Sequence, residues 1–147
     1  IATPGHVSNH FCFLEQNSGF LMTGDHIMNG STVVIIPPSG DMAAYIQSLK
    51  ILLDYPLTHL APGHGDIMED PTAVVRWLVD HRLQRESKVL SALQARPAAS
   101  VDELVLVVYD DVPVQVHPVA KLSLLAHLLK LEREQRATQI DKRWSAL

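Results

Sequence analysis

The sequence contains almost no cysteine and no long apolar run. Cys12 is the only cysteine among the 147 residues, so an internal disulfide framework is excluded. A lone thiol fits a reducing compartment, and we expect the protein to be cytoplasmic. The longest apolar run, residues 31–38, is interrupted by two prolines and is far shorter than the roughly 18–20 residues that span a bilayer. We therefore expect a soluble protein with no membrane partner, and 47% hydrophobic residues suffice for a folded core.

Lysine and arginine are nearly missing from the first half. Between residues 1 and 72, Lys50 is the only Lys or Arg, whereas this segment holds seven Asp or Glu residues and five of the eight histidines. An acidic, histidine-rich segment suits metal cations better than nucleic acid phosphates. From residue 73 onward, eleven basic residues stand beside nine acidic ones. That near balance argues against a duplex binder, which usually carries a basic stripe.

Turn residues and apolar spacing predict alternating strands and helices in the first two thirds of the chain. Gly19 can form the turn of a hairpin, Asp41 and Asp70 can cap helices, and Pro71 fits the first position of a helix. The expected elements are a β-hairpin over residues 10–25, a helix over 40–55, a short buried strand within 57–65 and a long helix over 70–94.

A different pattern follows. Ser100 stands before an Asp and a Glu in capping position, which predicts the start of a helix. The expected elements are a short helix over residues 100–111, a longer amphipathic helix over 117–137 and a small hairpin over 138–147. Two helices and a hairpin after a long helix are the outline of a winged-helix module. We therefore expect two domains, residues 1–95 and 96–147.

Three short motifs place a histidine or an aspartate directly after a glycine. They are "TPGH", "TGDH" and "APGHG", and they contribute His6, Asp25 and His64 at spacings of 19 and 39 residues. Imidazole and carboxylate are ligands of borderline divalent metals such as zinc. Glycine before each ligand permits a close backbone approach that a Cβ would obstruct. Each motif alone is common, but the three together predict a metal site at the ends of strands.

The same stretches carry a family resemblance. Residues 3–14, 20–53 and 60–65 closely resemble the second half of metallo-β-lactamase-fold hydrolases, and the tail after Asp70 resembles the winged-helix-like extension of the beta-lactamase-like protein 2 branch. The resemblance implies an α/β fold: the C-terminal half of an αββα sandwich followed by a small winged-helix-like α+β module. It also implies two zinc ions and a metal-bound hydroxide as the attacking group. By motif, His6 would bind the first metal, His64 the second, and the catalytic Asp25 would bridge both.

The leading motif of that family, His-x-His-x-Asp-His, is missing. It supplies four of the seven ligands, and the nearest stretch, residues 6–10, has another spacing and no acid. The chain also opens on Ile1 without a methionine. We therefore expect a fragment of a longer enzyme, inactive by itself and binding zinc weakly if at all.

Truncation of the sandwich has a second consequence. Without the first half, the inner face of the rear sheet would be exposed, and we expect four apolar residues on it: Phe11, Phe13, Phe20 and Met22. The partner that covers this face is expected to be the missing N-terminal half or a second copy of the chain.

Four further residues are candidates for support of the ligands or for substrate contacts: His10, His26, His81 and Arg82. His10 follows His6 by four residues and is either a support for the ligands or a plain strand histidine. The side chain of His26 is expected to point away from Asp25. On the long helix, His81 and Arg82 either contact a substrate phosphate or carboxylate or belong to a solvated, salt-bridged face, which we favour.

Two classes of function remain open. The first is a zinc-dependent hydrolase of a small-molecule or acyl substrate such as an ester, thioester or lactone. The second is a single-stranded RNA endonuclease or a nucleic-acid-binding module that acts through the winged-helix tail. We favour the first, because the tail is not strongly basic.

Overall fold

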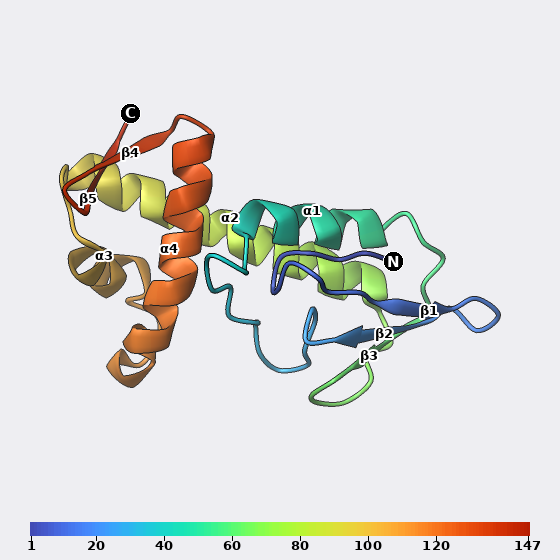
Figure 1. Cartoon of the computed structure of the whole chain (residues 1–147). Coiled ribbons are helices and arrows are strands. Elements are labelled where there is room, and N and C mark those ends of the chain that lie inside the picture. The colour runs from blue at the N-terminus through green and yellow to red at the C-terminus, as the bar shows by residue number, and fades with distance from the viewer. The chain divides into compact units, whose positions relative to one another are not determined.

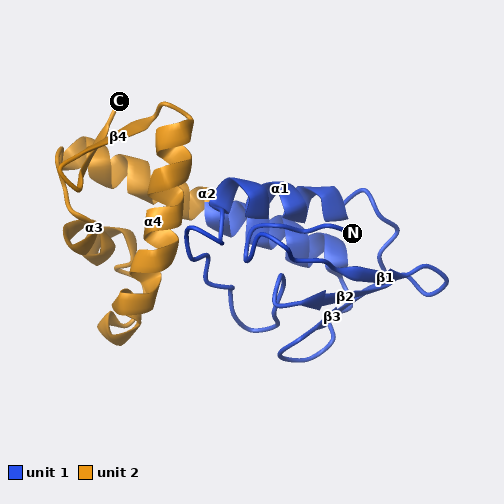
Figure 2. Cartoon of the chain, in the orientation of Figure 1, with its two compact units in different colours: residues 1–82 blue, residues 83–147 orange.

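The computed structural model describes all residues from 1 to 147, which form two compact units, Ile1–Arg82 and Leu83–Leu147 (Figure 2). By packing, the chain divides after Arg82, inside the long helix α2 (Pro71–Ala95), and the domain boundary between residues 95 and 96 stays a prediction. The reason for this division is that Val89 and Leu93 of α2 are fully buried in the core of the second unit. No helix combines the length and the apolar character that crossing a bilayer requires.

The first unit contains a sheet with strand order β1-β2-β3 (Figure 1). Strands β1 (Phe13–Glu15) and β2 (Phe20–Gly24) are antiparallel, and β3 (His59–Pro62) runs parallel to β2. The expected hairpin is confirmed, and its turn needs Gly19, whose φ is +75°. Because β2 and β3 are parallel neighbours, their carboxyl ends lie at the same edge of the sheet.

Helix α1 (Met42–Leu52) begins where the sequence predicted. The side chain of Asp41 accepts a hydrogen bond from the Ala44 amide at 2.9 Å. Asp70 caps α2 in the same way, because its Oδ1 accepts from the Ala73 amide at 2.9 Å. The apolar face of α1 is buried in the core of the first unit and consists of Met42, Tyr45, Ile46, Leu49 and Leu52.

One face of the sheet is apolar and exposed. Cys12 and Leu21 are fully buried, whereas Phe11, Phe13 and Met22 are exposed, with Phe13 at 66%. Phe20 is on the same side as Met22, since the two are two residues apart on one strand. It is half-buried, and its ring stacks on His59 at 4.4 Å. The four predicted residues therefore leave an apolar face largely open to solvent.

The second unit has the predicted helix, helix and hairpin order. It contains the second half of α2 and then α3 (Val101–Val108), the 3-10 turn η1 (Val114–Val116), α4 (His117–Arg133), β4 (Ala137–Ile140) and β5 (Arg143–Ala146). The expected capping box is present, with Ser100 and Glu103 each bonding the backbone of the other. Trp144 is fully buried in the core, and its backbone pairs with that of Ala99 at 2.8 and 2.9 Å. The hairpin thus closes the unit against the segment that leads into α3.

Candidate metal centre

The three predicted ligands lie around one hollow of about 220 Å³. Asp25 directly follows β2, and His64 comes two residues after β3. The ends of these strands are held together because the Gly63 amide donates to the Gly24 carbonyl at 2.9 Å. His64 Nε2 then lies 3.5 Å from Asp25 Oδ1, and both side chains are well exposed, at 75% and 52%. A carboxylate and an imidazole are thereby placed side by side, open to solvent.

His6 reaches the same hollow from the loop before β1. Its Nδ1 lies 2.8 Å from the carbonyl oxygen of Val34. A carbonyl can only accept, so Nδ1 carries the proton, and the lone pair of Nε2 is left for a ligand. Metal-binding histidines are typically oriented by such a bond. The ring of His6 is therefore prepared to bind a cation through Nε2.

Two of the glycines that precede these ligands, Gly5 and Gly63, lie close to other segments of the chain. Gly5 has a φ of +141°, and a Cβ built there would lie 2.2 Å from the Cα of Tyr45. A Cβ at Gly63 would lie 3.2 Å from the Gly24 carbonyl and 3.3 Å from Asp25 Oδ1. The sequence predicted a close backbone approach at all three glycines, and the contacts show it at Gly5 and Gly63, whereas a Cβ at Gly24 would meet only the side chain of His10.

Replacing Gly5 by Ala is expected to lower the free energy of unfolding by about 2–4 kcal/mol, because the methyl group overpacks α1 and the backbone becomes strained. Urea unfolding of the variant measures the loss. Gly30→Ala is the matched control, since Gly30 also has a positive φ of +76° but no atom lies within 4 Å of its added Cβ. Equal losses in the two variants would contradict a specific role for the contact with Tyr45.

The donor types fit a borderline divalent cation, but their number does not complete a site. Zinc prefers four ligands in a closed site. Across the chain, no group of three or more His, Cys, Asp or Glu side chains is close enough together to hold a metal ion. His6, Asp25 and His64 therefore offer donor atoms that suit such a cation, but these three side chains alone do not form a complete metal site.

His10 and His26 do not line the hollow of His6, Asp25 and His64. His10 Nδ1 is 2.9 Å from the hydroxyl of Thr3, and its ring stacks on that of His26 at 5.5 Å. Burial lowers the pKa of His10, and nearby His6 adds to the effect. His26 is fully buried, and burial together with His10 and His6 lowers its pKa to about 3. His26 lines no part of the hollow, and its low pKa keeps its ring neutral at neutral pH. The role of His10 toward the ligands stays a prediction.

The structure corrects the expectation for Arg82. This side chain is only 3% exposed, so it is neither a substrate contact nor part of a solvated face. Its Nη2 donates to the Val33 carbonyl at 2.6 Å, and its guanidinium lies over the Tyr45 ring at 5.3 Å. Arg82 thus holds Val33 in place, and the carbonyl of the next residue, Val34, orients the ring of His6. A partner 49 residues away in the sequence cannot be found from helical spacing.

His81 stays on α2 without joining the hollow. It is half-buried, and its ring stacks on Trp77 at 5.2 Å. Its predicted role toward substrate therefore stays a prediction, and the ring contact was not foreseen from the sequence.

Comparison with known proteins identifies the family. Residues 100–144 match the family model described as "Beta-lactamase associated winged helix domain". Over 136 residues, the chain is 35% identical to the "Beta-lactamase-like protein 2 homolog" of Drosophila melanogaster, a match that covers 91% of this chain and 45% of the relative. The chain belongs to the metallo-β-lactamase superfamily. It spans about half the length of the curated relatives it matches.

Two other comparisons report a further relative and a structural neighbour with the same fold. The chain is 34% identical over 155 residues to the "Atrochrysone carboxyl ACP thioesterase" of Aspergillus chevalieri, covering 97% of this chain and 49% of that relative. The crystal structure of a metallo-beta-lactamase family protein from Thermus thermophilus has a TM-score of 0.85 at 22% identity, with 100% of this chain and 48% of that chain covered. The predicted α/β fold with its winged-helix extension is thus confirmed.

Proposed function

We propose that this chain supplies the second half of a metal-dependent hydrolase that cleaves an acyl bond, in an ester, a thioester or a lactone. The observation that carries the proposal is the meeting of His6, Asp25 and His64 at one hollow in a member of the metallo-β-lactamase superfamily. A similar protein is named as a thioesterase, which favours an acyl substrate.

The roles proposed for the three side chains are those that the family resemblance implies. Asp25 lies beside His64 and would bridge two metals, with His64 on one of them and His6 on the other. Two zinc ions, when bound, lower the pKa of a water molecule and so provide a nucleophile near neutral pH. The chain holds His6 through the Val34 carbonyl and holds the Asp25 and His64 loops together through Gly63 and Gly24. Substrate would therefore meet a rigid arrangement of ligands.

The remaining ligands are proposed to come from a segment with the His-x-His-x-Asp-His motif. Two observations support this: the motif is missing from these 147 residues, and the relatives are about twice as long as the matched region. The exposed apolar face around Phe13 and Met22 is where a second sheet would pack. A second copy of the chain is the alternative cover. By itself the chain is expected to be inactive and to bind zinc weakly; a cytoplasmic location belongs to the same proposal.

A substrate panel tests the proposal. The complete protein, loaded with zinc, is assayed against acyl thioesters, lactones, nitrocefin and single-stranded RNA. We expect turnover of a thioester or a lactone. Cleavage of RNA with no turnover of any acyl substrate would overturn the proposal in favour of the nuclease alternative.

The winged-helix unit offers little basic surface for nucleic acid, because most of its cations are paired with acids. The pairs are Arg85–Asp111, Lys88–Asp110, Lys121–Asp102 and Arg143–Glu103, with Lys130 and Arg136 both on Glu86. Such pairing neutralises the charges that phosphate contacts would use.

We therefore expect only weak binding of duplex DNA by this chain. An electrophoretic shift assay at low salt measures it, and the expected result is no stable complex at micromolar protein. Tight binding that falls steeply with added salt would contradict the expectation, since it would reveal many phosphate contacts.

A further inference from the structure

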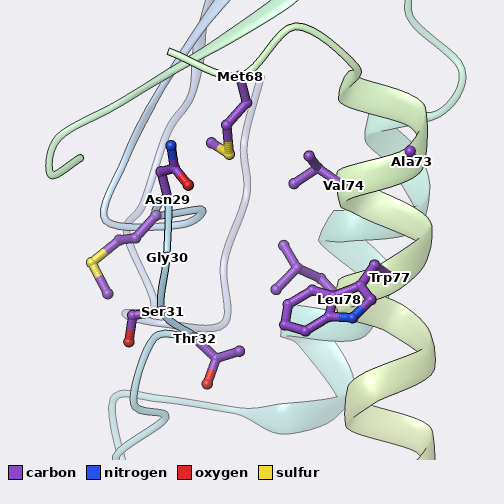
Figure 3. A pocket seen from close by; sticks show the side chains of 10 residues that line it. Asn29, Gly30, Ser31, Thr32, Met68, Ala73, Val74, Trp77 and Leu78 are labelled. Atoms are coloured by element: carbon purple, nitrogen blue, oxygen red, sulfur yellow. The ribbon is translucent and has the colours of Figure 1, made fainter. Parts of the chain in front are cut away.

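A second, larger hollow shares the lining residue Met28 with the hollow of His6, Asp25 and His64. It measures about 430 Å³, and it opens between the loop of residues 28–32 and the first turns of α2 (Figure 3). The side chains of Met68, Val74 and Leu78 face this loop across the space, and Trp77 forms part of the wall. None of the ten lining residues is charged. The volume is within the range of small-molecule sites, which is about 300–1,000 Å³.

The two hollows share a wall. Met28 lines both of them, and it stands three residues after Asp25. The next residue, Asn29, is fastened to the loop of His64: its amide lies 3.4 Å from the His64 carbonyl, and its Nδ2 donates to the Asp66 carbonyl at 3.2 Å. The loop that lines the larger hollow is therefore fixed to the two segments that carry Asp25 and His64. A molecule whose reacting end lies at Asp25 can extend into the larger hollow past Met28.

The chemistry of the lining selects one kind of occupant. We propose that the larger hollow binds the uncharged aliphatic or aromatic part of the acyl group, while the carbonyl to be cleaved lies at the hollow of His6, Asp25 and His64. The inference rests on the proposed hydrolase function. Methionine side chains adapt to apolar ligands of varied shape, and Trp77, which is 57% exposed, offers an uncovered aromatic surface. A phosphate or carboxylate would find no cation among the lining residues.

Tryptophan fluorescence measures this binding without catalysis. Trp77 lines the hollow, whereas the other tryptophan, Trp144, is fully buried in the second unit. The complete zinc-loaded protein is titrated with non-cleavable S-alkyl thioethers of N-acetylcysteamine that carry short to long alkyl chains. We expect the fluorescence to change and the affinity to rise on the order of fourfold per added methylene until the hollow is full. Trp77→Phe should remove the part of the fluorescence change that arises at the hollow, so the signal is the difference between the wild type and this variant.

Two helix variants test the location. Val74→Phe fills the hollow and should lower the affinity for the long thioethers about tenfold or more. Thr72→Phe is the control, because Thr72 is exposed on the same helix and does not line the hollow; its affinity should stay unchanged. In parallel, kcat/KM for the matching acyl thioesters should follow the same dependence on chain length.

The outcomes separate the two proposals. Chain-length-dependent binding that Val74→Phe weakens, with no hydrolysis of any acyl substrate, would overturn the hydrolase function and keep the hollow as an apolar binding site. Equal affinity for short and long chains, or no effect of Val74→Phe, would overturn the inference even in an active enzyme. The absence of any fluorescence change at Trp77 with every thioether would also overturn the inference, because it would mean that another part of the protein or a second copy covers this residue.

Discussion

Replacing Asp25 by Asn is expected to lower kcat/KM for the acyl substrate by more than about 100-fold, since loss of even an outer-shell partner of a metal ligand typically costs roughly 10- to 100-fold. The fold should be little affected. The Asp25 side chain is 52% exposed, and its one close ionic neighbour is the exposed His64, so the free energy of unfolding should change by less than about 1 kcal/mol. Kinetics, zinc content per chain and urea unfolding of the complete protein check the three statements.

A matched pair of histidines on one segment provides the control. His64 follows β3 at the hollow, whereas His59 begins β3 and stacks on Phe20. The His64→Ala variant, like the Asp25→Asn variant, should lose activity and bound zinc. The His59→Ala variant should keep its activity and its zinc. Full activity in His64→Ala, or equal losses in the two alanine variants, would contradict the assignment of ligands.

Replacing Glu86 by Ala is expected to lower the free energy of unfolding by about 3–5 kcal/mol, the usual cost of breaking a buried ion pair from one side. The Glu86 side chain is 5% exposed, and its oxygens lie 2.8 Å from Lys130 Nζ and 3.0 Å from Arg136 Nη1. Without Glu86, the nearly buried Lys130 keeps Glu134 as a partner at 2.8 Å. Urea unfolding at neutral pH measures the loss.

An exposed ion pair serves as the comparison. Lys121 and Asp102 form a pair in which the Asp102 side chain is 78% exposed. Asp102→Ala should therefore cost less than about 1 kcal/mol. If Glu86→Ala lowers the free energy of unfolding no more than Asp102→Ala does, the cluster of Glu86, Lys130 and Arg136 does not stabilise the second unit in the way the contacts indicate.

The same cluster predicts a pH dependence. Burial alone would raise the pKa of Glu86, but the neighbouring His127 and Lys130 outweigh it and lower the pKa from 4.5 to about 2. A carboxyl whose pKa is lower in the folded state stabilises the fold above its unfolded pKa, and this contribution disappears as the pH falls toward the folded pKa. The difference in unfolding free energy between the wild type and Glu86→Gln should therefore shrink from pH 5 to about pH 2. A constant difference over that range would contradict the linkage.

What the sequence predicted was mostly local. The caps at Asp41, Asp70 and Ser100 involve residues three apart, so the sequence alone reveals them. The sequence predicted that motifs at the ends of strands carry the ligands, but it did not reveal the parallel pairing of β2 and β3 that brings Asp25 and His64 together. It also did not reveal that His6 reaches the same hollow from the loop before β1. Buried cations on α2 could not be foreseen, because an arginine at a helical position looks the same whether it faces water or a distant carbonyl.

The division into units and the second hollow show the same limit. Leu93 continues the pattern of α2 without a break, and only tertiary packing assigns it to the second core. The loop of residues 28–32 carries no periodic pattern, and its role emerges from the hydrogen bonds of Asn29 to the His64 loop. Contacts between residues far apart in the sequence determine both features.

Anomalous diffraction at the zinc absorption edge, from crystals of the complete protein grown with zinc, tests the central claim most directly. The claim is that His6, Asp25 and His64 share a two-metal centre. We expect two anomalous peaks at the hollow, with His6 Nε2 and His64 about 2.0–2.1 Å from one metal each and the Asp25 carboxylate about 2.0–2.2 Å from both. Zinc bound elsewhere, with these three side chains free of metal, would contradict the account.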